Sequence, residues 1–200
     1  MTGINHLNFI IMKKTLSIIM VFCFAISCFA QEHLSFKGIP ITGSMTEFCK
    51  KLSQKGFTEI SSDNNTTFFL GDFTGRDATV AVGASDDGKS VYTVVVLFDS
   101  SGEWNELTNT YDYYKDIYTR KYGKTSFCKE KNPAYSKSNI CLMAEVDQGT
   151  VVWASQWKSK GGTIELSIEK ANGVYEGMVV IRYRDEQNVE NKIQRDINDI

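Results

Sequence analysis

The chain has 200 residues, of which 42% are hydrophobic and 23% charged, as in an ordinary globular protein. This length favours one domain over several. If an N-terminal leader is removed, Lys13 and Lys14 leave the set of 22 basic residues, and 20 remain against 24 acidic residues. Because this balance provides no basic field for a polyphosphate, nucleic acid is a poor candidate for a partner.

The N-terminus has the pattern of a secretory signal. Lys13 and Lys14 precede an apolar run over residues 16–30, which is too short for a membrane span of about 20 residues. We expect residues 1–30 to be a signal peptide, with translation starting at Met12, and no transmembrane segment in the mature chain.

Two processing sites compete at the end of this signal. Cleavage after Ala30 would release a periplasmic or secreted protein that begins at Gln31. The alternative is a degraded lipobox that ends at Cys28. Lipidation of Cys28 would make the protein an outer-membrane lipoprotein, and membrane attachment is expected only in that case.

The mature chain begins with an extended run over residues 34–41 and continues into a short helix. Ser44 and Glu47 have the spacing of a capping box, and Gly56 follows as a terminator of the helix. Its apolar stripe, which assigns Cys49 to the core, consists of Met45, Phe48, Cys49 and Leu52.

Three predicted strands follow, over residues 66–73, 76–84 and 90–98, and the turns between them predict an antiparallel meander. The third strand is apolar on both faces, which predicts a central position with both faces at least partly covered.

A longer helix is predicted to start at a second capping box, Ser100 to Glu103, and to end before Gly123. Aromatic residues recur along it at helical steps, and we expect this stripe to pack on the sheet. The stripe consists of Trp104, Leu107, Tyr111, Tyr114, Tyr118 and Tyr122.

The rest of the chain predicts a second meander. Its strands are expected over residues 126–129, 139–147, 150–158, 163–169 and 177–184. The tail, residues 185–200, is predicted to be a narrow amphipathic helix or to fray.

Together these elements predict an α+β fold in a single domain over residues 31–200. Two tandem repeats, residues 31–99 and 100–184, would each place a helix before an antiparallel meander. The meanders would join into one continuous antiparallel sheet with the helices on one face.

This order resembles the two-repeat architecture of beta-lactamase inhibitor proteins and of the related small outer-membrane assembly lipoproteins. A closer resemblance, over most of the mature chain, is to uncharacterised secreted proteins of Gram-negative bacteria. It depends on two patterns, Phe36-Lys37-Gly38-Ile39-Pro40-Ile41-x-Gly43 and Phe48-x-x-x-Leu52-x-x-x-Gly56-Phe57. Neither resemblance implies a catalytic or ligand-binding motif.

Three cysteines follow the leader. Cys128 and Cys141 flank a polar loop, and a hairpin there would bring their backbones together, which predicts a disulfide in an oxidising compartment. The alternative is two thiols that are buried or without a role.

Residues for catalysis are scarce. His33 is the one histidine after the leader and stands three residues into the expected mature chain, so we expect no His-dependent triad. One histidine is too few for a His-rich zinc site, and no cofactor or metal motif is present. Glu165 and Glu169 would share one strand face, so an envelope hydrolase acting through paired carboxylates is the alternative function.

A binding face is the main hypothesis. Trp153 and Trp157 would share a strand face beside Glu165 and Glu169 or Arg182 and Arg184, as exposed aromatic and arginine anchors do. The alternative places both tryptophans beneath a helix as core. We therefore expect a non-enzymatic exported protein that uses a sheet face to bind an envelope protein or glycan, with an outer-membrane structural lipoprotein as a further alternative.

Overall fold

The computed structural model describes residues 32–131 and 138–200. The predicted signal peptide, the start at Met12 and the lipidation of Cys28 fall outside this part of the chain. Residues 33–200 form one compact unit, and no helix among the described residues is long and apolar enough to cross a membrane.

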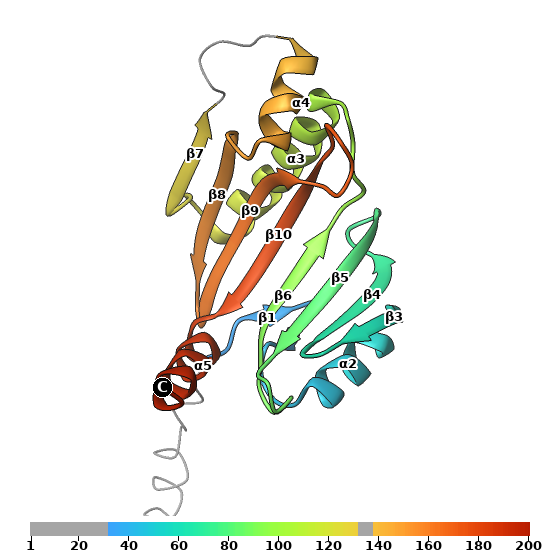
Figure 1. Ribbon diagram of the computed structural model, residues 1–200. Coiled ribbons are helices and arrows are strands. Elements are labelled where there is room, and N and C mark those ends of the chain that lie inside the picture. The colour runs from blue at the N-terminus through green and yellow to red at the C-terminus, as the bar shows by residue number, and fades with distance from the viewer. Residues whose placement is uncertain (1–31, 132–137) are drawn as a thin grey trace, which may run out of the picture. The chain divides into compact units, whose positions relative to one another are not determined.

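The fold is α+β, with four helices packed on one eight-stranded antiparallel sheet (Figure 1). The strand order is β3-β4-β5-β6-β10-β9-β8-β7, so β6 is central as predicted. The bounds of the strands are β3 (Thr58–Asp63), β4 (Thr66–Asp72), β5 (Asp77–Ala84), β6 (Val91–Leu97), β7 (Phe127–Lys131), β8 (Val152–Ser159), β9 (Gly162–Lys170) and β10 (Gly177–Asp185). Strand β3, which the sequence analysis missed, is exposed along its whole length and has a bulge between Glu59 and Ser61.

The predicted run over residues 34–41 is a two-stranded hairpin, β1 (Ser35–Phe36) and β2 (Ile39–Pro40). Its two turn residues, Lys37 and Gly38, both have positive φ angles, as the tightest hairpin turns require. Helix α2 (Met45–Gln54) follows as predicted, and the Ser44 hydroxyl caps it by accepting a hydrogen bond from the backbone N–H of Glu47.

Helix α3 (Trp104–Tyr122) packs its aromatic stripe on the sheet, as predicted, and lies behind β8, β9 and β10 in Figure 1. The predicted capping box from Ser100 to Glu103 is wrong, because Glu103 is itself the residue before the first helical residue and its side chain makes no cap. Ser101 instead accepts a hydrogen bond from the backbone N–H of Glu103 and donates one to the Glu106 carboxylate. Helices α2, α3 and α4 contribute side chains to one hydrophobic core, whose largest fully buried members include Trp157, Tyr111, Tyr114, Phe36, Phe48 and Phe69.

The strand predicted over residues 139–147 is wrong, because this segment is helix α4 (Asn139–Asp147). Ser138 accepts a hydrogen bond from the backbone N–H of Cys141 and caps this helix. Leu142, Met143 and Val146 then reach the core at helical spacing. The apolar residues of this segment suit either a strand or a helix, and the cap at Ser138 favours the helix.

This helix removes the hairpin on which the predicted disulfide depended. Cys128 lies on the edge strand β7, whereas Cys141 lies on α4. The predicted bridge between Cys128 and Cys141 is absent, and all three cysteines in the described residues are free thiols. The third, Cys49, is partly buried against the core, and desolvation raises its pKa.

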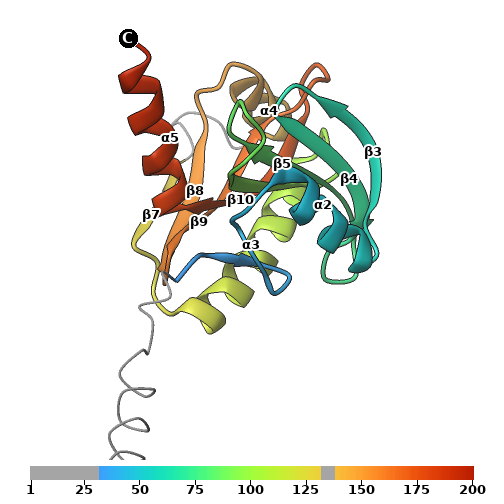
Figure 2. The same ribbon diagram turned by 90° about the horizontal axis from the view of Figure 1, so that it is seen from below.

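The tail is helical, as α5 (Glu186–Asn198), and contacts β6, β9 and β10. Figure 2 shows it apart from α2 and α3. Asp185 caps this helix, and the amide of buried Asn188 donates hydrogen bonds to the carbonyl oxygens of Ile41 and Val91. These two hydrogen bonds from the Asn188 side chain therefore fix the start of α5 to the first half of the fold.

Replacing Tyr114 with Ala should lower the free energy of unfolding by about 3 to 5 kcal/mol, because the ring is fully buried against Phe73 and Phe98. The neighbouring Tyr113, which is 45% exposed, is the matched control, and its replacement with Ala should cost about 1 kcal/mol or less. Urea denaturation measures both values. Equal losses at the two positions would contradict the packing of α3 described above.

Candidate functional site

Strand alternation separates the predicted site residues onto opposite faces of the sheet. Trp157 is paired with Ile164 and Trp153 with Ile168, so both tryptophans point toward the helices. The four predicted charged residues, Glu165, Glu169, Arg182 and Arg184, alternate with these positions and lie on the other face. We call this second face, which none of the core helices covers, the open face.

The two tryptophans lie beneath α3, as the alternative interpretation held. Trp157 is fully buried against Tyr118, and Trp153 is partly buried with its ring edge-on to Trp104 at 5.2 Å between centroids. Both indole N–H groups are buried without a hydrogen-bond partner in the described part of the chain. These rings are held by packing and do not adjoin the charged residues.

Three of the charged residues form one network on the open face. The guanidinium of Arg182 lies 3.1 Å from Glu165 Oε1 and 3.1 Å from Glu169 Oε1, and its second nitrogen is 3.3 Å from Glu169 Oε2. The Ser167 hydroxyl also donates to Glu169, at 2.6 Å. Arg184 is exposed and lies outside the network, near Thr163 and the first turn of α5.

The network bears on the hydrolase alternative. Partial burial disfavours the ionised form of Glu169, but the hydrogen bonds from Arg182 and Ser167 together outweigh it and lower the pKa of this carboxyl. A glycosidase needs one carboxyl with a raised pKa as its general acid. Glu169 therefore has the wrong shift for that role, and no group of His, Cys, Asp and Glu side chains within residues 32–131 and 138–200 could hold a metal ion.

A groove of about 310 Å³ lies at one end of the open face. Its floor is formed by the apolar side chains of Phe68 on β4, Leu97 on β6 and Met178 on β10, together with Thr79 on β5. Its rim is polar and includes Asp99, Asn172 and Glu176. Beyond this floor the exposed side chain of Leu70 continues the apolar surface along β4. An apolar centre with a polar rim is the usual composition of a protein-binding patch.

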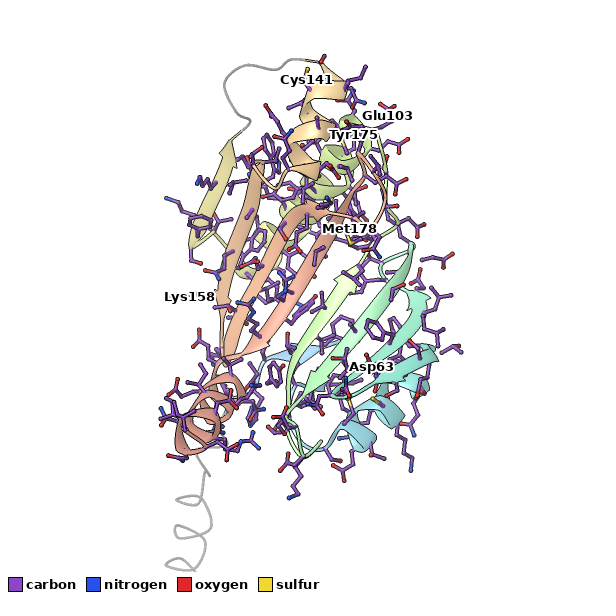
Figure 3. All side chains as sticks on the ribbon, in the orientation of Figure 1. Asp63, Glu103, Cys141, Lys158, Tyr175 and Met178 are labelled. Carbon is purple, nitrogen blue, oxygen red and sulfur yellow. The ribbon has the colours of Figure 1, made fainter. Side chains whose placement is uncertain are left out.

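The turn between β9 and β10 forms one side of the groove and carries two exposed hydrophobic residues. Val174 is 77% exposed and Tyr175 is 54% exposed. Figure 3 places Tyr175 above Met178, at the upper end of the open face. Tyr175 also has a φ of 57°, a left-handed backbone that costs a residue with a side chain about 1 kcal/mol or more.

The turn is held in this conformation by the loop that precedes α3. Ser101 and Gly177 exchange two backbone hydrogen bonds, of 2.9 and 3.0 Å, and the Ser100 hydroxyl donates to Glu176 at 2.8 Å. The aromatic ring of Tyr175 is therefore presented on a fixed support.

The strands on either side of this turn were predicted from the sequence, but the groove and a binding role for the turn were not. The available signal was the third predicted strand, apolar on both faces, because Val95 and Leu97 need a cover that no predicted helix supplied. Glu165, Glu169 and Arg182 were predicted from the sequence to lie beside Trp153 and Trp157, but the ion pairs among them were not predicted, and the tryptophans lie on the other face.

Comparison with protein-family models, with curated proteins and with solved structures gives no match for this chain. The geometry of the site therefore carries the functional argument alone.

Replacing Glu169 with Gln tests the network through its pH dependence. Because the pKa of Glu169 is lower in the folded protein than its ordinary value of 4.5, its carboxylate stabilises the fold above that pH. This contribution is lost as the pH falls through the folded-state value. The stability difference between the wild type and E169Q should thus be largest near pH 7 and shrink toward about pH 3.

Urea denaturation at both pH values measures this difference. The control is E59Q, which removes an exposed glutamate that has no ion pair in the described part of the chain. A difference between the wild type and E169Q that stays constant with pH would contradict the network.

Proposed function

We propose that this protein is a non-enzymatic binding protein that holds a partner protein on the open face of its sheet. The observation that carries the proposal is the groove over Phe68, Leu97 and Met178, one side of which is formed by the turn that also carries the exposed Tyr175. Tyrosine on a rigid support beside an apolar depression is the usual form of an interface hot spot. The Arg182 network would set the orientation of the partner, because charged groups at an interface fix register more than they add affinity.

The proposal extends to a two-repeat architecture. Each half of the fold places a helix before four antiparallel strands, α2 before β3 to β6 and α3 before β7 to β10, with α4 inserted after β7. Both meanders proceed from an edge of the sheet to its centre, where β6 and β10 pair antiparallel. This order supports tandem repeats at residues 31–99 and 100–184, related by a pseudo-twofold axis between the central strands.

The partner is proposed to be an envelope protein, reached after export by the signal of residues 1–30. An exposed apolar surface that continues over Leu70 is better suited to a protein than to a hydrated glycan. A glycan partner and an outer-membrane lipoprotein held by Cys28 are the competing proposals from the sequence.

Site-specific photo-crosslinking in cells tests the face. A benzophenone amino acid at Leu70, on the open face, should give a discrete crosslinked product that mass spectrometry identifies as a protein. The same probe at Ile140, an equally apolar and 79% exposed residue on α4, is the control and should not give that product. Absence of any adduct at Leu70, or the same adduct at both positions, would contradict the proposal.

The substitution Tyr175→Asn tests the turn. Asparagine tolerates positive φ better than tyrosine, so the fold should be retained and the melting temperature should stay within a few degrees of the wild-type value. Loss of the ring should weaken binding of the crosslinked partner by about 2 kcal/mol, or roughly thirtyfold, as at a hot spot. Titration calorimetry with the identified partner measures this, with Ile140→Ala as control. An unchanged affinity would remove Tyr175 from the interface.

A further inference from the structure

Helix α5 carries an apolar stripe that stays exposed in the described part of the chain. Val189, Ile193 and Ile197 recur at every fourth residue, so they lie along one side of the helix. Val189, near the start of the helix, is partly buried, whereas Ile193 is 44% exposed and Ile197 is 51% exposed. The stripe is therefore an apolar surface without a partner.

This stripe adjoins the open face. Val189 lines a crevice together with Thr163 and Arg184, which are paired across β9 and β10 on the open face. Ile193 and Ile197 continue the same side of the helix away from that crevice. Figure 2 shows α5 projecting from the sheet on the side opposite α3. The helix thus stands as an apolar wall at one end of the open face.

The groove lies at the other end of the same face. Met178, on the floor of the groove, is the second residue of β10, whereas α5 directly follows Asp185, the last residue of β10. The extended strand between these two residues spans about 23 Å. One face of the sheet therefore has an unfilled groove at one end and an uncovered helix at the other.

We propose that the partner on the open face is a second copy of this chain, an inference that rests on the proposed use of this face for protein binding. The two copies pack open face to open face about a twofold axis that is parallel to the sheet and crosses β10 at right angles near Arg182. This axis reverses the direction of β10, so α5 of each copy lies over the groove of the other. Ile193 and Ile197 then contact the floor of that groove, as the anchors of an amphipathic helix do.

The distribution of side chains on the open face favours this axis. On β4, β5 and β6 the face is formed mainly by uncharged side chains, whereas β9 and β10 carry the Arg182 network. An axis perpendicular to β10 places each of these two parts opposite its counterpart in the second copy. An axis along β10 would press the charged network against the apolar part and remove its charges from water. The uncharged side chains include Phe68, Leu70, Thr79, Ala81, Val95 and Leu97.

The area of the two surfaces is that of a stable dimer. The six strands between the two edge strands lie about 4.8 Å apart and are at least seven residues long, so they present a face of roughly 650 Å². The exposed side of α5, about 15 Å long and 10 Å wide, adds roughly 150 Å². The sum, about 800 Å² per copy, equals the contribution of each partner to an interface of standard size. The α5 stripe is too small to hold two copies together without the sheet face.

Sedimentation equilibrium of the purified protein tests the dimer. The protein should sediment with twice the mass of the chain, and the double variant I193Q/I197Q should raise the dimer Kd about tenfold or more, because it sets two amides against an apolar floor. The control is Ile140→Gln, which removes a more exposed isoleucine from α4 and should change the Kd less than about twofold. Thermal melting verifies the fold of each variant. If I193Q/I197Q melts early, Leu70→Gln on β4 provides the same comparison.

Photo-crosslinking of the purified protein tests the position of α5. A benzophenone amino acid replaces Ile197, and this protein is mixed with isotopically labelled wild-type protein. The adduct should have twice the mass of the chain, and mass spectrometry should map it to a labelled peptide that contains Leu97 or Met178. The label shows that the contact joins two copies and does not form within one.

The inference and the proposed function can fail separately. A purified protein that stays monomeric at about 0.1 mM overturns the second copy as the partner. A different protein crosslinked at Leu70 in cells would then still support the proposed function, whereas no adduct at Leu70 would remove both. A dimer that I193Q/I197Q leaves intact, one that Ile140→Gln weakens equally, or an adduct outside the open face overturns the twofold arrangement.

Discussion

The pairing of β6 with β10 is the interaction on which the rest of the fold depends. Val96 faces Ile181 and Val94 faces Tyr183 on the helix side, while Val95 and Leu97 lie opposite Arg182 and Val180 on the open face. This pairing joins two meanders, which would otherwise be separate four-stranded sheets, into one sheet with one core. It also brings Leu97 of the first half beside Met178 of the second, so that the groove is formed by both halves.

The sequence predicted what depends on local patterns. The cap at Ser44 and the aromatic spacing from Trp104 to Tyr122 correctly located α2 and α3, since both signals arise within a few residues of the structure they specify. The strand assigned to residues 139–147 was wrong because a short segment rich in apolar residues satisfies either structure, and α4 is selected by a cap at Ser138 and by contact with the core.

The candidate site was harder to predict because it depends on which face of the sheet the helices cover. Alternation along each strand predicted that Trp153 and Trp157 share one face of β8 and that Glu165 and Glu169 share one face of β9. It did not predict whether these two faces lie on the same side of the sheet. That depends on strand register, a long-range property. A glutamate in register with a buried tryptophan would have been costly, so the observed register separates the charged network from the core.

The two edges of the sheet have a further consequence. An eight-stranded sheet that does not close into a barrel presents unpaired backbone groups on its outermost strands, which are templates for uncontrolled assembly. Strand β3 interrupts this template with its bulge between Glu59 and Ser61, and β7 carries Lys129, Glu130 and Lys131 in succession. Both features discourage the addition of further strands at the two edges of the sheet.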